Sequence, residues 1–171
     1  MATRLDSGER CEDHRMTHDE KPDKIVVGVD GSPSSEQALR WATRHARLSS
    51  GELHAVTVWA IPTTYGWAPV AADFDWEDIA RSNLEQTLRD ALGETEAARV
   101  ERHVVQGHPA HVLLDAAADA DLLVVGSRGR GGFTGLLLGS VSQHVIAHAD
   151  CPVVVVRETA AVPTSVSGEE G

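Results

Sequence analysis

The spacing of hydrophobic residues along residues 24–157 switches repeatedly between two patterns, a short continuous run and a helical period. Between short apolar runs, the apolar residues recur three or four positions apart, as on the buried stripe of a helix; Ala38, Leu39, Ala42 and Ala46 are one example. Alternating strands and helices predict a single-domain, Rossmann-like α/β fold, with a parallel sheet and helices on both faces. The runs are typical of buried strands and cover 24–30, 52–59, 99–106, 122–126 and 153–157.

The two ends of the chain lack this periodicity. Residues 1–23 carry four basic and seven acidic side chains among few large apolar ones, a composition that does not offset the entropy of ordering. We therefore expect flexible tails at 1–23 and 158–171 around a folded domain at 24–157. The segment 59–76 is rich in proline, glycine and tryptophan, and it predicts a long loop that forms a lid or an interface.

Charge, cysteine content and hydropathy limit the kinds of partner and compartment that we expect for this protein. The net charge of −11 and the isoelectric point near 5.1 argue against nucleic acid, which selects positive surfaces. The two cysteines, Cys11 and Cys151, match no metal or redox spacing and fit a reducing compartment. Because no 18-residue apolar span occurs, we expect no membrane segment and a cytoplasmic protein.

A glycine pattern follows the apolar run 122–126. Gly126 and Gly129 are followed, after nine intervening residues, by Gly139 and Ser140, which open a predicted helix. A strand that ends in glycines before a helix N-terminus brings bare N–H groups together, and this favours phosphate over the alternative of a flexible surface loop. The pattern is neither a Walker A loop, which needs a lysine, nor a dinucleotide fingerprint. Positive charge would then come from the helix N-terminus and two arginines, Arg128 and Arg130.

Catalytic and metal-binding signals are weak. His144 and His148 are four residues apart and His108 and His111 three apart, but neither pair has a third ligand nearby in the sequence. Solvent-facing or capping histidines explain both pairs, so we expect no metal site. The chain lacks Gly-x-Ser-x-Gly and shows no base partner for its serines, and we expect no catalytic residue.

Four motifs stand out when the chain is taken as a whole: Lys24-Ile-Val-Val-Gly-Val-Asp-Gly-Ser32, Gly107-x-Pro-Ala110, Gly126-x2-Gly129-x9-Gly139-Ser140 and Cys151-Pro-Val-Val-Val-Val-Arg157. Together they resemble the universal stress protein family and, through the complete glycine spacing, its ATP-binding subgroup. The resemblance implies a five-stranded sheet of order 3-2-1-4-5 and a homodimer. The apolar edge strand 153–157 agrees with such a dimer, because an exposed edge aggregates unless it is paired.

The resemblance also implies an ATP site, with Mg²⁺ a plausible companion. Gly28 would leave room beside the base, Val58 would present its backbone to adenine, and Asp30 would lie near the ribose or the phosphates. From the residues alone, Asp30 also reads as a turn residue, and Ser140 and Ser142 as helix caps. The full predicted site comprises Gly28, Asp30, Val58, Gly126, Ser127, Arg128, Gly129, Arg130, Gly131, Gly132, Gly139, Ser140, Val141 and Ser142.

The leading hypothesis is an ATP-binding stress-response regulator with little or no catalysis, because the motifs offer phosphate donors without a general base. One alternative is a slow ATPase or nucleotidyl-transfer enzyme. The other is a nucleotide-free protein-interaction module. The sequence identifies no downstream protein partner.

Overall fold

The structure is a computed structural model, and it describes residues 21–61, 75–130 and 138–158. The predicted tails therefore lie almost wholly outside the described residues, as do Gly131, Gly132 and most of the segment 59–76. The elements in chain order are β1 (Lys24–Gly28), α1 (Pro33–Ser49), β2 (Glu52–Trp59), α2 (Trp76–Leu92), α3 (Glu94–Ala97), β3 (Glu101–Gln106), α4 (Pro109–Ala117), β4 (Leu122–Gly126), α5 (Ser140–His148) and β5 (Val153–Val156).

The strands form one parallel sheet in the order β3-β2-β1-β4-β5, which confirms the predicted fold and strand order. β1 lies at the centre, with Ile25 opposite Leu53 of β2 and Leu122 of β4. The chain first winds outward from β1 through β2 to β3, and then returns to add β4 and β5 on the other side. The winding direction thus reverses between β1 and β4, where a crevice opens at the carboxyl ends of the strands.

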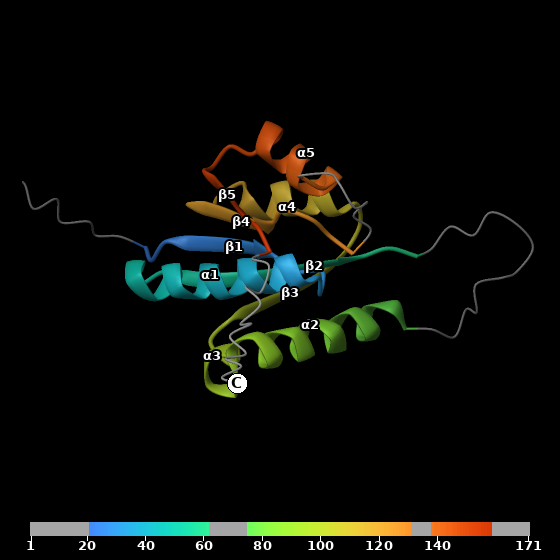
Figure 1. Cartoon of the computed structure of the whole chain (residues 1–171), viewed down its shortest axis with the longest axis horizontal. Coiled ribbons are helices and arrows are strands. Elements are labelled where there is room, and N and C mark those ends of the chain that lie inside the picture. Colours follow the sequence, from blue (N-terminus) through green and yellow to red (C-terminus); the bar gives the residue numbers. More distant parts are fainter. Residues whose placement is uncertain (1–20, 62–74, 131–137, 159–171) are drawn as a thin grey trace, which may run out of the picture.

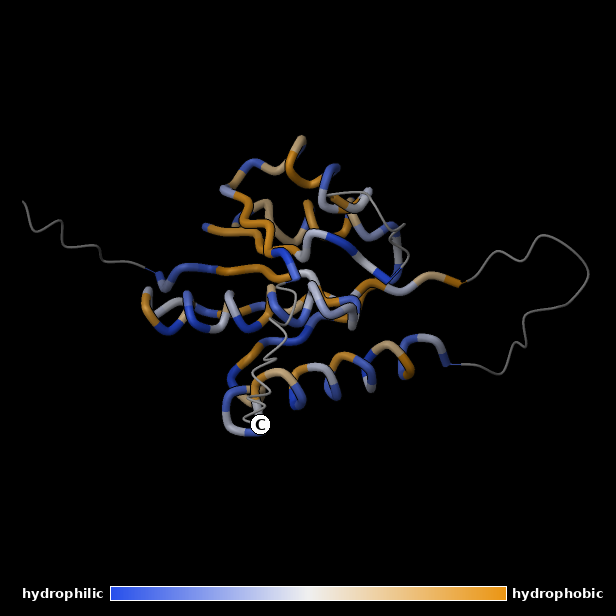
Figure 2. The backbone as a smooth tube through the Cα atoms, viewed as in Figure 1, coloured by the Kyte–Doolittle hydropathy of each residue, from blue (hydrophilic) through white to orange (hydrophobic). Residues whose placement is uncertain are grey.

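Helices cover both faces of the sheet, with α4 and α5 above the strands and α2 below them in Figure 1. Side chains alternate along β1: Ile25 and Val27 pack with α1, α2 and α3, and Val26 packs with α4 and α5. The middle part of β1 is hydrophobic, whereas hydrophilic and hydrophobic residues alternate along the helices (Figure 2). The predicted α1 stripe is confirmed, because its members are all buried; they are Ala38, Leu39, Ala42 and Ala46.

The structure differs locally from the sequence prediction: β3 begins at Glu101 rather than at residue 99, and β5 ends at Val156 rather than at residue 157. The short helix α3 was not predicted, because four residues are too few to show a helical period. β1 ends at Gly28 rather than at residue 30, although the Val29 N–H still donates to the Val56 carbonyl at 2.9 Å. Within the described residues, no helix is both long and apolar enough to cross a membrane.

Candidate functional site

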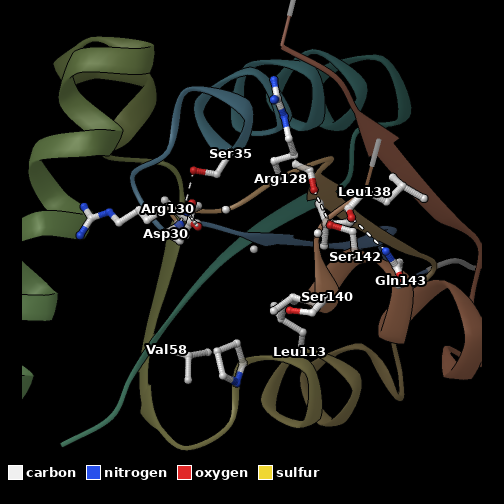
Figure 3. A pocket seen from close by; sticks show the side chains of 18 of the residues that line it. Asp30, Ser35, Val58, Leu113, Arg128, Arg130, Leu138, Ser140, Ser142 and Gln143 are labelled. Carbon is white, nitrogen blue, oxygen red and sulfur yellow. Dashed lines mark hydrogen bonds between the residues drawn. The ribbon is translucent and has the colours of Figure 1, made fainter. Parts of the chain in front are cut away.

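A cavity of about 510 Å³ opens at the carboxyl ends of β1, β2 and β4, in the crevice where the winding reverses. The amino ends of α4 and α5 complete its wall (Figure 3). Eleven of the predicted site residues line it: Gly28, Asp30, Val58, Gly126, Arg128, Gly129, Arg130, Gly139, Ser140, Val141 and Ser142.

One side of the cavity is apolar. Val56 and Val58 on β2 face Pro109 and Leu113 on α4, and Figure 3 shows Val58 and Leu113 on the same side of the cavity. The space beside Gly28 is used by the protein itself, because a Cβ at Gly28 would lie 3.1 Å from a Leu113 methyl carbon. Glycine at this position therefore lets α4 approach the end of β1.

The opposite side is the glycine loop, which is fastened to the start of α1. The Asp30 carboxylate accepts hydrogen bonds from the Ser32 N–H at 3.0 Å and the Ser32 hydroxyl at 2.6 Å. Its other oxygen accepts from the Arg130 N–H at 3.1 Å, and the Ser34 hydroxyl donates to the Arg128 carbonyl. Asp30 thus joins the end of β1, the N-cap of α1 and the loop after β4.

These contacts explain two of the loop glycines. A Cβ on Gly129 would lie 2.7 Å from Asp30 Oδ2, and one on Gly126 would lie 2.6 Å from Ser34 Oγ and 2.8 Å from the backbone of the same serine. Neither spacing is possible for a real side chain. At Gly126 two of the opposing atoms are backbone, so the loop needs glycine there to lie against α1, whether or not a ligand is present; at Gly129 a side chain would displace the Asp30 carboxylate from its hydrogen bonds.

The start of α5 presents backbone N–H donors without a cap from its own N-cap residue. Ser32 caps α1 and Asp75 caps α2 through their side chains, whereas the N-cap of α5 is Gly139, which has no side chain. The first N–H groups of a helix have no intrahelical partner, and here they belong to residues that line the cavity. The Ser142 hydroxyl is turned inward and donates to the Gly126 carbonyl at 2.7 Å, so it fixes α5 to β4.

The two arginines are placed differently from these backbone donors. In Figure 3 their guanidinium groups point away from Val58 and Leu113. Arg128 pairs with Glu158 at 3.6 Å, and the Arg130 guanidinium lies over Gly31, where a Cβ would meet it at 2.4 Å. As placed, the cavity offers an anion mainly backbone N–H groups and the positive end of α5.

Ser127 is the described predicted residue that does not line the cavity. Its side chain is buried, its N–H donates to the Val156 carbonyl at 2.7 Å, and its carbonyl accepts from the Gly139 N–H at 2.7 Å. Ser127 therefore holds the two glycine segments together from behind.

Sequence reasoning missed most of the apolar wall. Two signals were available: Val56 precedes Val58 by two residues on the same strand face, and Leu113 follows Pro109 by one helical turn. The cavity-lining residues that were not predicted are Val29, Ser35, Val56, Pro109, Leu113, Val125, Leu138 and Gln143.

Asp30 is the one acidic side chain among the described lining residues. Burial acts to raise the pKa of its carboxyl, but hydrogen bonds from Ser32, Ser35 and the Arg130 N–H outweigh this and lower the pKa. Asp30 is thus a stable carboxylate already occupied by three donors, which makes it a poor proton acceptor.

Comparison with known proteins places this fold and cavity in a family. The profile of the universal stress protein family matches residues 22–157. The chain belongs to the universal stress protein family. A universal stress protein of Mycolicibacterium smegmatis is 39% identical over 150 residues, which cover 85% of this chain and 49% of that protein. The chain spans about half the length of the curated relatives it matches.

Two solved universal stress proteins were determined with adenine nucleotides. One, in complex with cAMP, is 28% identical with a TM-score of 0.57, over 82% of this chain and 100% of that one. The other, from Archaeoglobus fulgidus in complex with dAMP, is 28% identical with a TM-score of 0.53, over 78% of this chain and 97% of that one.

Proposed function

We propose that this chain binds ATP, with Mg²⁺ as a companion cation, and acts as a nucleotide-dependent regulator in a stress response. One observation carries the proposal: a single cavity has an apolar side on β2 and α4 and, facing it, the start of α5, where the N-cap Gly139 supplies no side chain to bind the first N–H groups of the helix. An adenine nucleotide has the same division between a flat, largely apolar base and an anionic end.

In the proposed complex, the base lies against Val56, Val58 and Leu113. The phosphates lie beside Gly139 at the start of α5, where the helix dipole and the N–H groups of Ser140 and Val141 favour negative charge. The ribose lies between these two sides, near Gly126 and Gly129. The universal stress proteins solved with cAMP and dAMP support an adenine nucleotide as the ligand class.

The described lining residues support binding rather than turnover. Their one carboxylate, Asp30, has a lowered pKa and accepts bonds from Ser32 and Arg130, so it is not free to activate water. We therefore expect at most slow hydrolysis of ATP, with the nucleotide acting as a ligand that shifts conformation or partner affinity.

We also propose a cytoplasmic homodimer joined through the strand at 153–157. β5 pairs with β4 on one side, and its half-buried valines form an edge of the described sheet. Pairing this edge with a second copy would satisfy its free backbone groups. Sedimentation equilibrium tests the dimer, and a proline in place of Val155 should shift the protein to monomer.

A matched pair of variants at Ser140 tests nucleotide binding. Proline is tolerated at the first position of a helix, and Gly139 before it is extended (φ −75°, ψ 162°), as proline requires. Ser140→Pro thus removes one N–H from the proposed phosphate site while keeping α5. Ser140→Ala keeps that N–H and removes the hydroxyl.

The expected results differ between the two variants. One hydrogen bond to a charged group contributes about 1.5–3 kcal/mol, so S140P should raise the Kd for Mg-ATP roughly 10- to 100-fold in calorimetry, and S140A much less. Wild-type protein that binds no ATP, AMP or cAMP, and releases none on denaturation, would leave the protein-interaction module as the function. Turnover well above about one per minute would favour the enzyme alternative, since enzymes usually reach about 1–10³ per second.

A further inference from the structure

Two imidazoles and a carboxylate meet on neighbouring edge strands of the sheet. His54 on β2 lies opposite Glu101 on β3, and Val56 lies opposite His103. Paired residues of parallel strands share a face, as do residues two apart on one strand. His54, Glu101 and His103 therefore project from the same face of the sheet, and none of them lines the cavity of the proposed function.

The three side chains present ligand atoms at metal-binding distances. His54 Nδ1 lies 3.1 Å from His103 Nε2 and 3.5 Å from Glu101 Oε2, and His103 Nε2 lies 3.4 Å from Glu101 Oε1. Ligands about 2.0–2.1 Å from a tetrahedral zinc ion are about 3.3–3.4 Å apart. Among the described residues, this is the group of three such side chains whose ligand atoms all lie within 4.8 Å of one another.

One of the three side chains is buried, and the other two are accessible to solvent. The His54 side chain is 11% exposed, whereas those of His103 and Glu101 are 38% and 60% exposed. Val105, the next residue of β3 on this face, is also exposed. A cation can therefore reach the group from solvent, and water can fill a fourth position.

We propose that His54, Glu101 and His103 bind a divalent transition-metal ion, with Zn²⁺ as the cation that fits their donor set best. Two imidazole nitrogens and one carboxylate oxygen suit zinc, whereas Mg²⁺ and Ca²⁺ prefer oxygen ligands throughout. The site is independent of nucleotide binding, so its failure would leave the proposed function untouched.

The second ring nitrogen of His54 agrees with this assignment. His54 Nε2 is buried and has no hydrogen-bond partner among the residues that the structure describes, and the Glu52 carboxylate lies 3.9 Å away on the same strand. A histidine that ligates a metal through one nitrogen commonly donates its other N–H to a carboxylate. Glu52 is 60% exposed, so its side chain is free to close this distance.

The charges around the group are compatible with a bound cation. The Glu101 and Glu52 carboxylates lie 3.5 and 3.9 Å from the two ring nitrogens of His54, so negative charge flanks the group. The Lys24 ammonium, a positive charge on the neighbouring strand β1, is paired with Asp119 at 2.5 Å.

A second row of histidines provides the control. His108, His111, His144 and His148 follow one another along α4 and α5 with ring centroids 5.2, 5.4 and 4.3 Å apart. The packing of α4 against α5 thus brings the two histidine pairs next to each other, which the sequence did not indicate. His148 Nδ1, however, lies 2.8 Å from the His144 carbonyl, as expected for a local helix contact rather than a shared ion.

Zinc titration of the full chain, without a polyhistidine tag and in competition with a chromogenic chelator, tests the proposal. Losing even a second-shell partner typically weakens metal binding about 10- to 100-fold, so H103A and E101Q should each raise the Kd for the tightest equivalent of Zn²⁺ at least about tenfold. Both residues are partly exposed, and circular dichroism of each variant checks that it folds. The H144A/H148A and H14A/H18A variants remove other histidine pairs and are the controls. Both should still bind the tightest equivalent of Zn²⁺ as the wild type does.

Cobalt supplies an independent readout. Co²⁺ should give the visible absorption of a low-coordinate site in the wild type and in H144A/H148A, and this absorption should be lost in H103A. Three results would overturn the proposal: no tight equivalent in the wild type, an equivalent that survives in folded H103A and E101Q, or one that disappears with H144A/H148A or H14A/H18A.

Discussion

Gly126 ends β4 against the first turn of α1, and the structure leaves no space there for a side chain. An alanine Cβ would lie 2.6 Å from Ser34 Oγ and 2.8 Å from both the Ser34 carbonyl carbon and the Ser35 nitrogen. Two of these atoms belong to the backbone of a capped helix, so they cannot move away as a side-chain end can. Gly126→Ala must therefore push β4 and α1 apart.

The cost follows from this overlap. Overpacking a core position typically destabilises by about 1–3 kcal/mol. For a folded unit of about 130 residues, the entropy of unfolding near 60 °C is about 0.3 kcal/mol/K, so the melting temperature should fall by roughly 3–10 °C. The measurement is thermal and urea unfolding followed by circular dichroism, with the wild type as reference.

Gly139→Ala is the matched control, because Gly139 belongs to the same glycine pattern but has room. Its Cβ would meet nothing closer than 3.5 Å, at Arg128 Cα, and its φ of −75° suits any residue. The small entropic gain of alanine and its weaker N-capping oppose each other, and the change should stay within about 1 kcal/mol. Equal melting temperatures for G126A and wild type, or an equal loss in G139A, would refute the packing argument.

Three further predictions follow from the core, the α1 cap and Asp30. Leu88→Ala should lower the free energy of unfolding by about 2–5 kcal/mol in urea titrations, and Leu48→Ala, 87% exposed, by less than about 0.5 kcal/mol; equal losses would contradict the assigned burial. Ser32→Ala should cost about 1–2 kcal/mol, because it removes the α1 cap and a donor to Asp30. Because the pKa of Asp30 is lowered on folding, its carboxylate stabilises the protein above pH about 3.8, and this contribution is lost as the pH falls further. The free energy of unfolding should therefore fall less steeply with decreasing pH in Asp30→Asn than in the wild type, and an identical pH dependence would refute this.

The strands and the buried helix stripes were predictable from the sequence because they depend on local periodicity. The run 122–126 and the stripe containing Leu39 are apolar at the spacing that a strand or a helix imposes, and this signal survives without knowledge of any partner. Eleven predicted site residues also line one cavity, because strand ends and the helix starts that follow them meet at the same edge of a parallel sheet.

Other parts of the site depend on contacts between segments distant in the chain. Leu113 fills the space beside Gly28, and Asp30 binds the Arg130 N–H one hundred residues away. Ser142, which also reads as a helix cap in the sequence, instead donates its hydroxyl to the carbonyl of Gly126 across the fold. Such pairings leave no periodic trace in the sequence.

The sequence by itself determined the alternation of strands and helices, the glycine spacing and the family, because each of these depends on the order of residues within short segments. Only the tertiary structure decided which donors stay free at α5, which glycines are needed for packing, and that His54 meets His103. The physical reason is the register of the parallel sheet, which places side chains 49 residues apart within hydrogen-bond distance. Histidines close together in the sequence drew attention to the helices, while the sheet brought together a pair that no spacing rule connects.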